Sequence, residues 1–177
     1  MNIILFGPPG AGKGTQAKYI VKKTNGFQIS TGDMLREEIQ NNSEIGKKII
    51  NDMNEGKFVS DEIVNEIIKK VIFDGYPRSL SQAEKLDLLL KNSNQKIDFI
   101  FFLNVNKDTI IKRIEKRKII EKRSDDELDT ILKRYDTYME TTKPVLEFYS
   151  KKPNFYEIDG ALEIDQITNK IGAFLKV

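Results

Sequence analysis

The segment "GPPGAGKGT", residues 7–15, places four glycines and one lysine between an apolar run and a helical pattern. Glycines allow successive backbone N–H groups to turn inward around an anion, and a following helix adds the positive end of its dipole. Lys13 offers a charge for the outer phosphates of a polyphosphate, and Thr15 offers a hydroxyl to Mg²⁺ or to a phosphate oxygen. In such loops Ser or Thr usually follows the lysine directly, whereas Gly14 intervenes here. We predict a phosphate-binding loop rather than a glycine turn with an exposed lysine.

Four arginines in the second half of the chain have positions that suit further phosphates. Arg113 and Arg117 are four residues apart and therefore share one face of a helix. Arg123 precedes the next helical pattern, and Arg134 lies eleven residues further on, nearly on the same side. Guanidinium forks fit phosphate oxygens better than lysine does, and phosphoryl transfer depends mainly on positioning and charge neutralisation. The pattern is typical of that chemistry, although Arg113 could equally pair with a surface acid such as Glu115.

Several carboxylates stand at the ends of predicted elements. Asp74 ends the apolar run 71–74, and open α/β sheets bind their ligands at the carboxyl ends of strands. Asp33 and the pair Asp125–Asp126 begin helical patterns, where the helix dipole also favours acids. Asp74 therefore lies where ligand chemistry is expected, or it only caps the next turn, and Asp33 could likewise be only a cap.

The composition excludes several classes of protein. The chain has 177 residues with 29 basic and 27 acidic side chains, and a net charge of +2 argues against a dedicated nucleic-acid binder. Cysteine and histidine are both absent, which excludes disulfides, thiolate zinc sites and histidine-based triads. No apolar stretch reaches the roughly 20 residues of a membrane helix, and no basic leader precedes the first apolar run. We expect a cytoplasmic protein without membrane or nucleic-acid partners, and a monomer.

The elements that must position these residues follow a regular alternation. Five short apolar runs predict buried strands, at residues 2–6, 27–30, 71–74, 98–105 and 155–159. Helical patterns lie between them, which indicates an α/β fold with a parallel, doubly wound sheet of five strands. Residues 30–59 and 117–123 fit the sheet less well and are predicted to be excursions from the core. In the long helical pattern that follows, Pro144 predicts an end or a kink.

One connection is unusually short. The helical pattern of residues 61–70 runs into the strand 71–74 almost directly, whereas helix-to-strand connections usually take about 2–6 residues. About ten residues are missing here by comparison with ordinary connections of this kind. Either residues 66–72 carry a real deletion or the sequence has a gap at this point.

Four motifs together resemble the nucleoside monophosphate kinases, and most closely the adenylate kinases with a short lid. They are "GPPGAGKGT" at 7–15, "STGDMLR" at 30–36, "FDGYPRSLSQA" at 73–83 and "RSDDELDTILKRYDTY" at 123–138. The resemblance spans essentially the whole chain and implies Mg²⁺-dependent transfer of the ATP γ-phosphoryl group to AMP, giving two ADP. It also implies a three-layer α/β/α P-loop core (1–29, 60–116 and 124–177), a helical nucleoside monophosphate-binding flap (30–59) and a short lid (117–123). It implies no zinc.

The resemblance also implies roles for individual residues, beginning with catalysis by Lys13, Arg78, Arg117, Arg123 and Arg134. The implied ATP-binding residues are Gly10, Ala11, Gly12, Lys13, Gly14, Thr15, Arg113 and Arg117. The implied AMP-binding residues are Thr31, Gly32, Arg36, Lys57, Val59, Gly75, Arg78, Gln82, Arg123 and Arg134. The magnesium ion would be held by Asp74 and Asp33 through water, together with Thr15.

The identity of the accepting base rests on the fewest residues. Thr31 and Gln82 match positions at which adenylate kinases contact adenine, but Gln82 also fits a capping box with Ser79. A UMP/CMP kinase with the same fold and mechanism is therefore the alternative function. A P-loop GTPase is less compatible with the sequence, because no "NKxD" motif is present and the arginines would have no role.

Overall fold

The computed structural model describes residues 1–24, 26, 28–30, 72–92, 94–121 and 127–176. Its elements are β1 (Ile3–Phe6), α1 (Lys13–Thr24), β2 (Gln28–Ser30), β3 (Ile72–Asp74), α5 (Leu80–Asn92), β4 (Phe99–Asn104), α6 (Lys107–Glu121), α7 (Leu128–Ser150), β5 (Phe155–Asp159) and α8 (Ile164–Leu175). Each of the five predicted strands is observed inside the range predicted for it.

The strands form one sheet in the order β2-β3-β1-β4-β5, and every pairing is parallel. This confirms the predicted α/β fold with a five-stranded parallel sheet. β1 is central, with Leu5 in register with Asp74 of β3 and with Phe101 of β4. The chain builds β2 and β3 on one side of β1, and β4 and β5 on the other. The carboxyl end of β1 is therefore the topological switch point, where open α/β sheets bind ligands.

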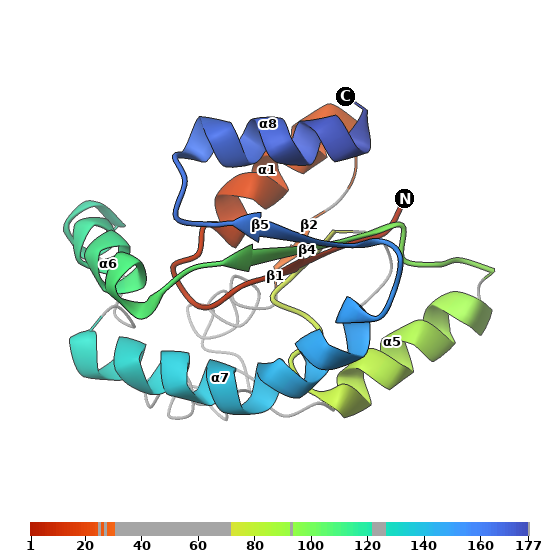
Figure 1. Ribbon diagram of the computed structural model, residues 1–177, viewed down its shortest axis with the longest axis horizontal. Helices are drawn as coiled ribbons and strands as arrows, with labels where there is room; N and C mark the ends of the chain where they lie inside the picture. The colour runs from red at the N-terminus through yellow and green to blue at the C-terminus, as the bar shows by residue number, and fades with distance from the viewer. Residues whose placement is uncertain (25, 27, 31–71, 93, 122–126, 177) are drawn as a thin grey trace, which may run out of the picture.

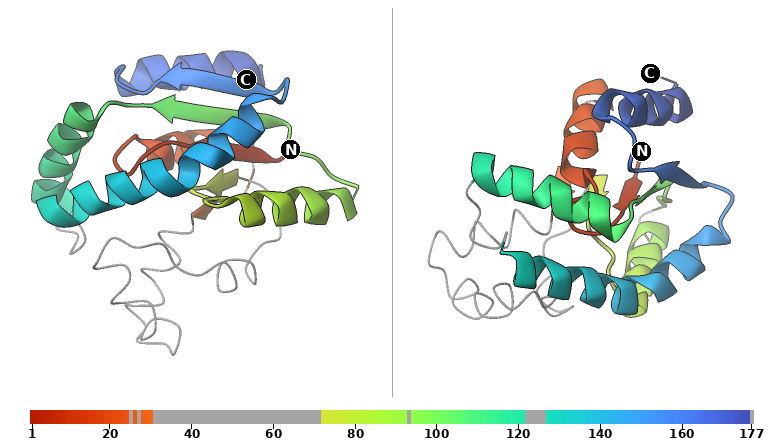
Figure 2. Two further views of the ribbon diagram at one scale, coloured as in Figure 1. Left: turned by 60° about the horizontal axis from the view of Figure 1, so that its bottom comes forward. Right: turned by 60° about the vertical axis from the view of Figure 1, so that its left-hand side comes forward.

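Helices cover both faces of the sheet (Figure 1). α1 and α8 pack on one face, α5 and α7 pack on the other, and α6 lies at the edge to which the strands point (Figure 2). Alternation along β1 explains the two layers, because Ile3 and Leu5 join the core under α1 and α8 whereas Ile4 and Phe6 join the core under α5 and α7. All four are fully or almost fully buried, and each such side chain stabilises the fold by about 1.5–3 kcal/mol.

Helix α7 continues through Pro144 to Ser150, so of the two outcomes predicted at this proline, an end or a kink, the end is wrong. A proline inside a helix removes one backbone hydrogen bond. Beyond it, Val145 and Tyr149 are fully buried against the core under α5 and α7, and this burial favours continuation of the helix.

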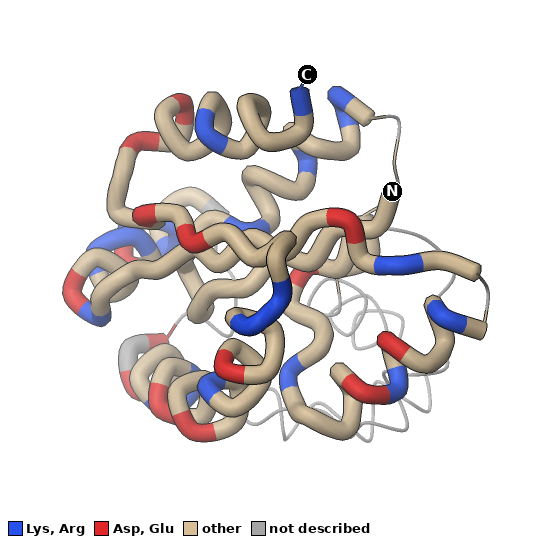
Figure 3. The backbone as a smooth tube through the Cα atoms, turned by 45° about the vertical axis from the view of Figure 1, so that its right-hand side comes forward, with Lys and Arg blue, Asp and Glu red and all other residues tan. Residues whose placement is uncertain are grey.

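Parts of the predicted domain division lie outside the described residues. This applies to the flap beyond Ser30 and to the short connection up to residue 71, while residues 117–121 of the predicted lid are the last turns of α6. No described helix combines the length and the apolar character needed to cross a membrane. Basic and acidic residues are interspersed along the described helices other than α1, which carries lysines but no acidic residue (Figure 3).

Candidate active site

The glycine-rich loop joins β1 to α1 at the switch point. Its turn is closed by the backbone N–H of Ala11, which donates to the carbonyl of Pro8 at 3.1 Å. Gly10 and Gly12 have φ angles of 81° and 92°, a left-handed backbone conformation that residues other than glycine rarely adopt. A Cβ atom on Gly10 would also lie 2.9 Å from Cγ1 of Ile114. The loop therefore depends on glycine both for its backbone conformation and for its close packing against α6.

Lys13, the first residue of α1, points its ammonium group back into this loop. Nζ donates hydrogen bonds to the carbonyls of Gly7 at 2.8 Å and Pro8 at 3.2 Å. Burial of the ammonium group lowers the pKa of Lys13 to about 8 from its usual value of 10.5. The Asp74 carboxylate opposes this shift, while Arg78, Arg134 and Arg117 add to it, in that order. Lys13 thus occupies a positive field that an anion would relieve.

Asp74 ends β3 beside the start of α1. The carboxylate is 8% exposed, and Nε2 of Gln28 donates to its Oδ2 at 3.1 Å. A Cβ atom on Gly14 would lie 3.6 Å from the same oxygen, so the carboxylate faces the first turn of the helix that begins with Lys13. Asp74 therefore lies at the carboxyl end of its strand, as the sequence predicts, and next to the glycine-rich loop.

The turn after β3 presents Arg78 to the same edge. Its Nε donates to the carbonyl of Gly75 at 2.6 Å, and its backbone N–H donates to Oε1 of Gln82 at 2.7 Å. The backbone N–H of Gln82 in turn lies 3.3 Å from Oγ of Ser79. Gln82 is 3% exposed and holds this turn, which resembles the cap predicted as the alternative to its adenine contact.

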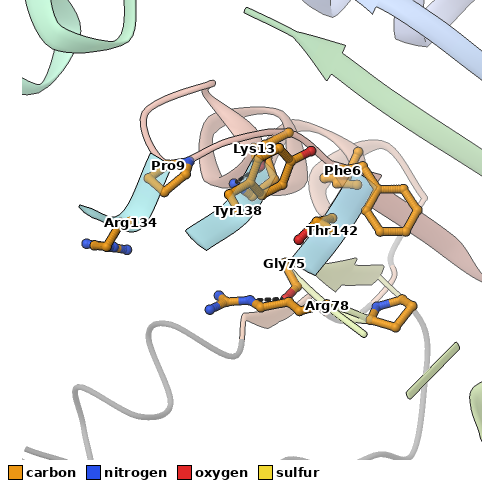
Figure 4. A pocket seen from close by; sticks show the side chains of 11 residues that line it. Phe6, Pro9, Lys13, Gly75, Arg78, Arg134, Tyr138 and Thr142 are labelled. Carbon is orange, nitrogen blue, oxygen red and sulfur yellow. Dashed lines mark hydrogen bonds between the residues drawn. The ribbon is translucent and has the colours of Figure 1, made fainter. Parts of the chain in front are cut away.

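These parts surround one cavity of about 50 Å³. Four of the predicted site residues line it, namely Lys13, Gly75, Arg78 and Arg134 (Figure 4). The remaining lining residues are Leu5, Phe6, Gly7, Pro9, Pro77, Tyr138 and Thr142. Three cations from α1, from the turn after β3 and from α7 therefore meet at the switch point of the sheet.

The other predicted site residues lie elsewhere or outside the described part of the chain. Arg113 of α6 donates to the carbonyls of Gly160 at 2.6 Å and Leu162 at 3.2 Å, and so anchors the loop after β5. Arg117 does not line the cavity, although its charge reaches Lys13. Seven predicted residues lie outside the described residues: Thr31, Gly32, Asp33, Arg36, Lys57, Val59 and Arg123.

Two lining residues, Tyr138 and Thr142, are absent from the sequence prediction. Their signal is positional, because Arg134, Tyr138 and Thr142 are spaced four residues apart and therefore lie along one face of α7. Once Arg134 is assigned to the site, the same helical spacing therefore indicates that Tyr138 and Thr142, one and two turns further along, are its neighbours.

A parallel sheet with a glycine-rich loop at its switch point, and with cations of three elements around one cavity, defines the class of P-loop phosphotransferases. A protein-family model described as adenylate kinase matches residues 5–154. The adenylate kinase of Pelagibacter ubique is 51% identical to the chain, and the alignment covers all of both chains. Relatives of the same name are 39% identical in Mycoplasma capricolum (all of both chains) and 40% identical in Caulobacter sp. strain K31 (100% of this chain and 99% of the relative).

The chain therefore belongs to the adenylate kinase family and is a nucleoside monophosphate kinase. The names of its full-length relatives support adenylate kinase function and do not support the UMP/CMP alternative.

The relatives also differ from the chain in length. The alignment with the Pelagibacter relative runs over 213 positions but holds only the 177 residues of this chain, so at least 36 positions have no counterpart here. The alignment with the Caulobacter relative runs over 187 positions, which leaves at least 10 without a counterpart. The chain is thus shorter than both relatives, by very different amounts.

Proposed function

We propose that this chain catalyses the reversible transfer of the γ-phosphoryl group of ATP to AMP, with Mg²⁺, to give two ADP. The observation that carries the proposal is the meeting of Lys13, Arg78 and Arg134 around one cavity at the switch point. Two nucleotides placed phosphate to phosphate carry a dense negative charge. Three fixed cations from separate elements suit that charge. Phosphoryl transfer requires little covalent chemistry of the protein and depends mainly on such positioning and charge neutralisation.

In this proposal the glycine-rich loop binds ATP through residues 10–15, with its backbone N–H groups facing the phosphates. Lys13 and Arg134 neutralise the charge that develops on the phosphoryl group during transfer, and Arg117 and Arg123 act on the same group. Arg113 contributes on the ATP side, where its hydrogen bonds to the loop after β5 hold that loop beside α6.

Arg78 is proposed to bind the phosphate of AMP. Its Nε is held by the carbonyl of Gly75, so the guanidinium plane is oriented before the nucleotide arrives. Gly75 and Gln82 contribute to the same side, and so do the flap residues Thr31, Gly32, Arg36, Lys57 and Val59. The flap at 30–59 and the lid at 117–123 are proposed to close over the two nucleotides and exclude water.

The residues near the loop fit a magnesium ion that arrives with ATP. Mg²⁺ prefers oxygen ligands and keeps several waters, and in nucleotide enzymes it is bound through one or two carboxylates and the substrate phosphates. Asp74 supplies such a carboxylate next to the first turn of α1, while Thr15 and Asp33 complete the proposed set. When bound, the ion would neutralise phosphate charge and orient the γ-phosphoryl group.

The length differences support a short lid and a shortened connection before β3. A chain that lacks at least 36 positions of one relative but about 10 of another resembles the shorter relative in overall plan. The difference of at least 10 positions from the Caulobacter relative is close to the roughly ten residues that the sequence predicts to be missing before β3, where residues 66–72 are expected to carry either a deletion or a gap in the sequence. The monomeric state and the cytoplasmic location stay predictions from the sequence.

A coupled assay tests the proposed reaction. ATP and Mg²⁺ are combined with AMP, UMP, CMP or GMP in turn, and ADP formation is followed at equal nucleotide concentrations. We expect AMP to be turned over with the highest kcat/KM. Because the four acceptors differ in their base, the order of their kcat/KM values reports which base the site prefers. Turnover of none of the four above background would overturn the proposal, and a preference for UMP or CMP would overturn its choice of acceptor.

A further inference from the structure

Two hydroxyl groups in the cavity have no role in the reaction as proposed above. Tyr138 is 7% exposed and Thr142 is 1% exposed. Their hydroxyl oxygens are buried, and neither has a hydrogen-bond partner within the described parts of the chain. Both line the cavity together with Lys13 and Gly75 (Figure 4). Since burying a hydroxyl without a partner is costly, the two groups indicate that something polar binds between them and the strand ends.

Water fits this space better than an apolar group does. A buried water needs about 10–15 Å³ of such volume and two to four polar partners, so a cavity of about 50 Å³ has room for about three. Three of its lining residues, Tyr138, Thr142 and Lys13, carry the two hydroxyls and an ammonium group. That ammonium has three N–H groups, and its hydrogen bonds to Gly7 and Pro8 account for two of them.

We propose that Tyr138 and Thr142 are positioning residues whose hydroxyls hold ordered water against Lys13. The water keeps the ammonium group, and the phosphate oxygens that it meets, in fixed positions while the phosphoryl group is transferred. This inference rests on the phosphoryl transfer proposed above. It also requires that the side chains of Tyr138 and Thr142 do not touch the nucleotides.

The arrangement on α7 links this water to a catalytic cation. Arg134 lies one turn before Tyr138 and two turns before Thr142, on the same face. One rigid helix therefore sets the distance between the guanidinium group on one wall of the cavity and the bound water. Small displacements of reacting groups reduce the rate of transfer more than they reduce binding. Loss of either hydroxyl should therefore lower kcat and leave KM nearly unchanged.

The decisive experiment separates the hydroxyl of Thr142 from its shape. Thr142→Val keeps the shape and removes the hydroxyl, whereas Thr142→Ser keeps the hydroxyl and removes a methyl group. In the coupled AMP assay we expect Thr142→Val to lower kcat about tenfold, with KM for both nucleotides within about twofold, and Thr142→Ser to retain most activity. A packing role predicts the reverse order, because Val fills the site and Ser does not.

Tyr138→Phe provides the second arm, with Tyr149→Phe as its matched control on the same helix. The hydroxyl of Tyr149 already has protein partners, since it lies 3.3 Å from Oδ1 of Asp87. We expect Tyr138→Phe to lower kcat about tenfold with an unchanged melting temperature, and Tyr149→Phe to lower the melting temperature with an unchanged kcat. Thr141→Val, at an exposed position beside Thr142, should change neither quantity.

The double variant Tyr138→Phe/Thr142→Val tests the shared water. If both hydroxyls act through the same water, the double variant should lose about as much as one single variant, and not the product of the two losses. Wild-type activity in the same assay keeps the two proposals apart. An inactive wild type would overturn the phosphoryl transfer, whereas an active wild type with fully active Tyr138→Phe and Thr142→Val variants would overturn only the role of the hydroxyls.

Discussion

The middle of helix α7 and its C-terminal end have different polar surroundings. In the middle turns, Arg134, Tyr138 and Thr142 line the cavity with a cation and two hydroxyls that lack partners in the described chain. At the C-terminal end, the hydroxyl of Tyr149 lies 3.3 Å from Asp87 of α5. Lys152, just past the helix, pairs with the same carboxylate at 2.5 Å and lies 4.7 Å from the centre of the Tyr149 ring.

The difference teaches where this fold is stabilised and where it is prepared for a ligand. Polar groups at the far end of α7 satisfy one another, so their burial favours the folded chain without any ligand. Around the cavity, cations lie close together, and two buried hydroxyls have no partner within the described residues. Both features raise the free energy of the folded chain, and a bound anion and bound water would lower it. The stable contact between α5 and α7 keeps the costly groups in place. Both helices adjoin the cavity, since Arg78 lies just before α5 and Arg134 is on α7.

The two lysines make the contrast sharpest. Within the described residues Lys13 donates to two backbone carbonyls, and the charges near it are the Asp74 carboxylate and the guanidinium groups of Arg78, Arg134 and Arg117. Lys152 has a carboxylate partner and two aromatic rings, those of Phe148 and Tyr149. Removing Lys13 should therefore affect function, and removing Lys152 should affect stability.

The largest effect is expected from Lys13→Ala. The variant loses the charge that faces the transferring group, and loss of one such donor typically costs about 10²–10³-fold in kcat. We expect transfer to fall by at least that factor while the melting temperature is not lowered, because burial, the main cause of the lowered pKa of Lys13, disfavours its ammonium group in the folded chain. The coupled assay and a thermal scan measure both quantities. Lys18→Ala, at an exposed position of the same helix, is the matched control and should resemble wild type. Full activity of Lys13→Ala would show that the loop assignment is wrong.

Arg78→Ala should weaken AMP binding more than ATP binding. The guanidinium group is pre-oriented by its hydrogen bond to Gly75, and a buried charge-assisted contact of this kind contributes about 2–4 kcal/mol. Titration calorimetry with each nucleotide separately gives the two dissociation constants, so ATP serves as the internal control. Equal weakening of both nucleotides would contradict the assignment of Arg78 to the AMP side.

The sequence predicts those features of the site that depend on local chemistry. The apolar run of β1, the glycines that follow and Asp74 at the end of β3 each carry their own signal, and the structure places all of them at the switch point. Tyr138 and Thr142 were missed because a hydroxyl on an amphipathic helix has no signal of its own. Only the packing of α7 against the strand ends turns them toward the cavity. The sequence also left open whether α7 ends or only kinks at Pro144, because burial of Val145 and Tyr149, which favours continuation, depends on tertiary packing.

The pH dependence of ATP binding sharpens the comparison at Lys13. The pKa of Lys13 is about 8 in the ligand-free chain, and a bound polyphosphate raises it by stabilising the ammonium form. Binding must then take up protons, about half a proton near pH 8. The contribution of Lys13 to the affinity for ATP is at its maximum well below pH 8. Above pH 8 the affinity should fall about tenfold per pH unit, until the pKa of Lys13 in the complex is reached.

Calorimetry in buffers of different ionisation enthalpy measures this proton uptake directly. Lys13→Arg is the matched variant, because a guanidinium group is not deprotonated in proteins and its affinity should not depend on pH in this range. For the ligand-free chain the sign is opposite. The fold favours neutral Lys13, so the contribution of this residue to stability rises as the pH increases from about 8 to 10.5. A pH-independent ATP affinity in the wild type would mean that the ammonium group does not meet the phosphates.

The smallest effect is expected at the other end of α7, from Lys152→Ala. The variant removes a partly exposed ion pair with Asp87 and the contacts with two aromatic rings, which together stabilise the chain by about 1 kcal/mol. In a chain of this length the melting temperature should fall by about 2–4 °C, less so at high salt, with kcat and both KM values unchanged. Lys151→Ala, at the exposed neighbouring position, should leave the melting temperature as it is. A loss of kcat in Lys152→Ala without a loss of stability would contradict the separation of roles along α7, because it would give the stabilising end of the helix a direct part in transfer.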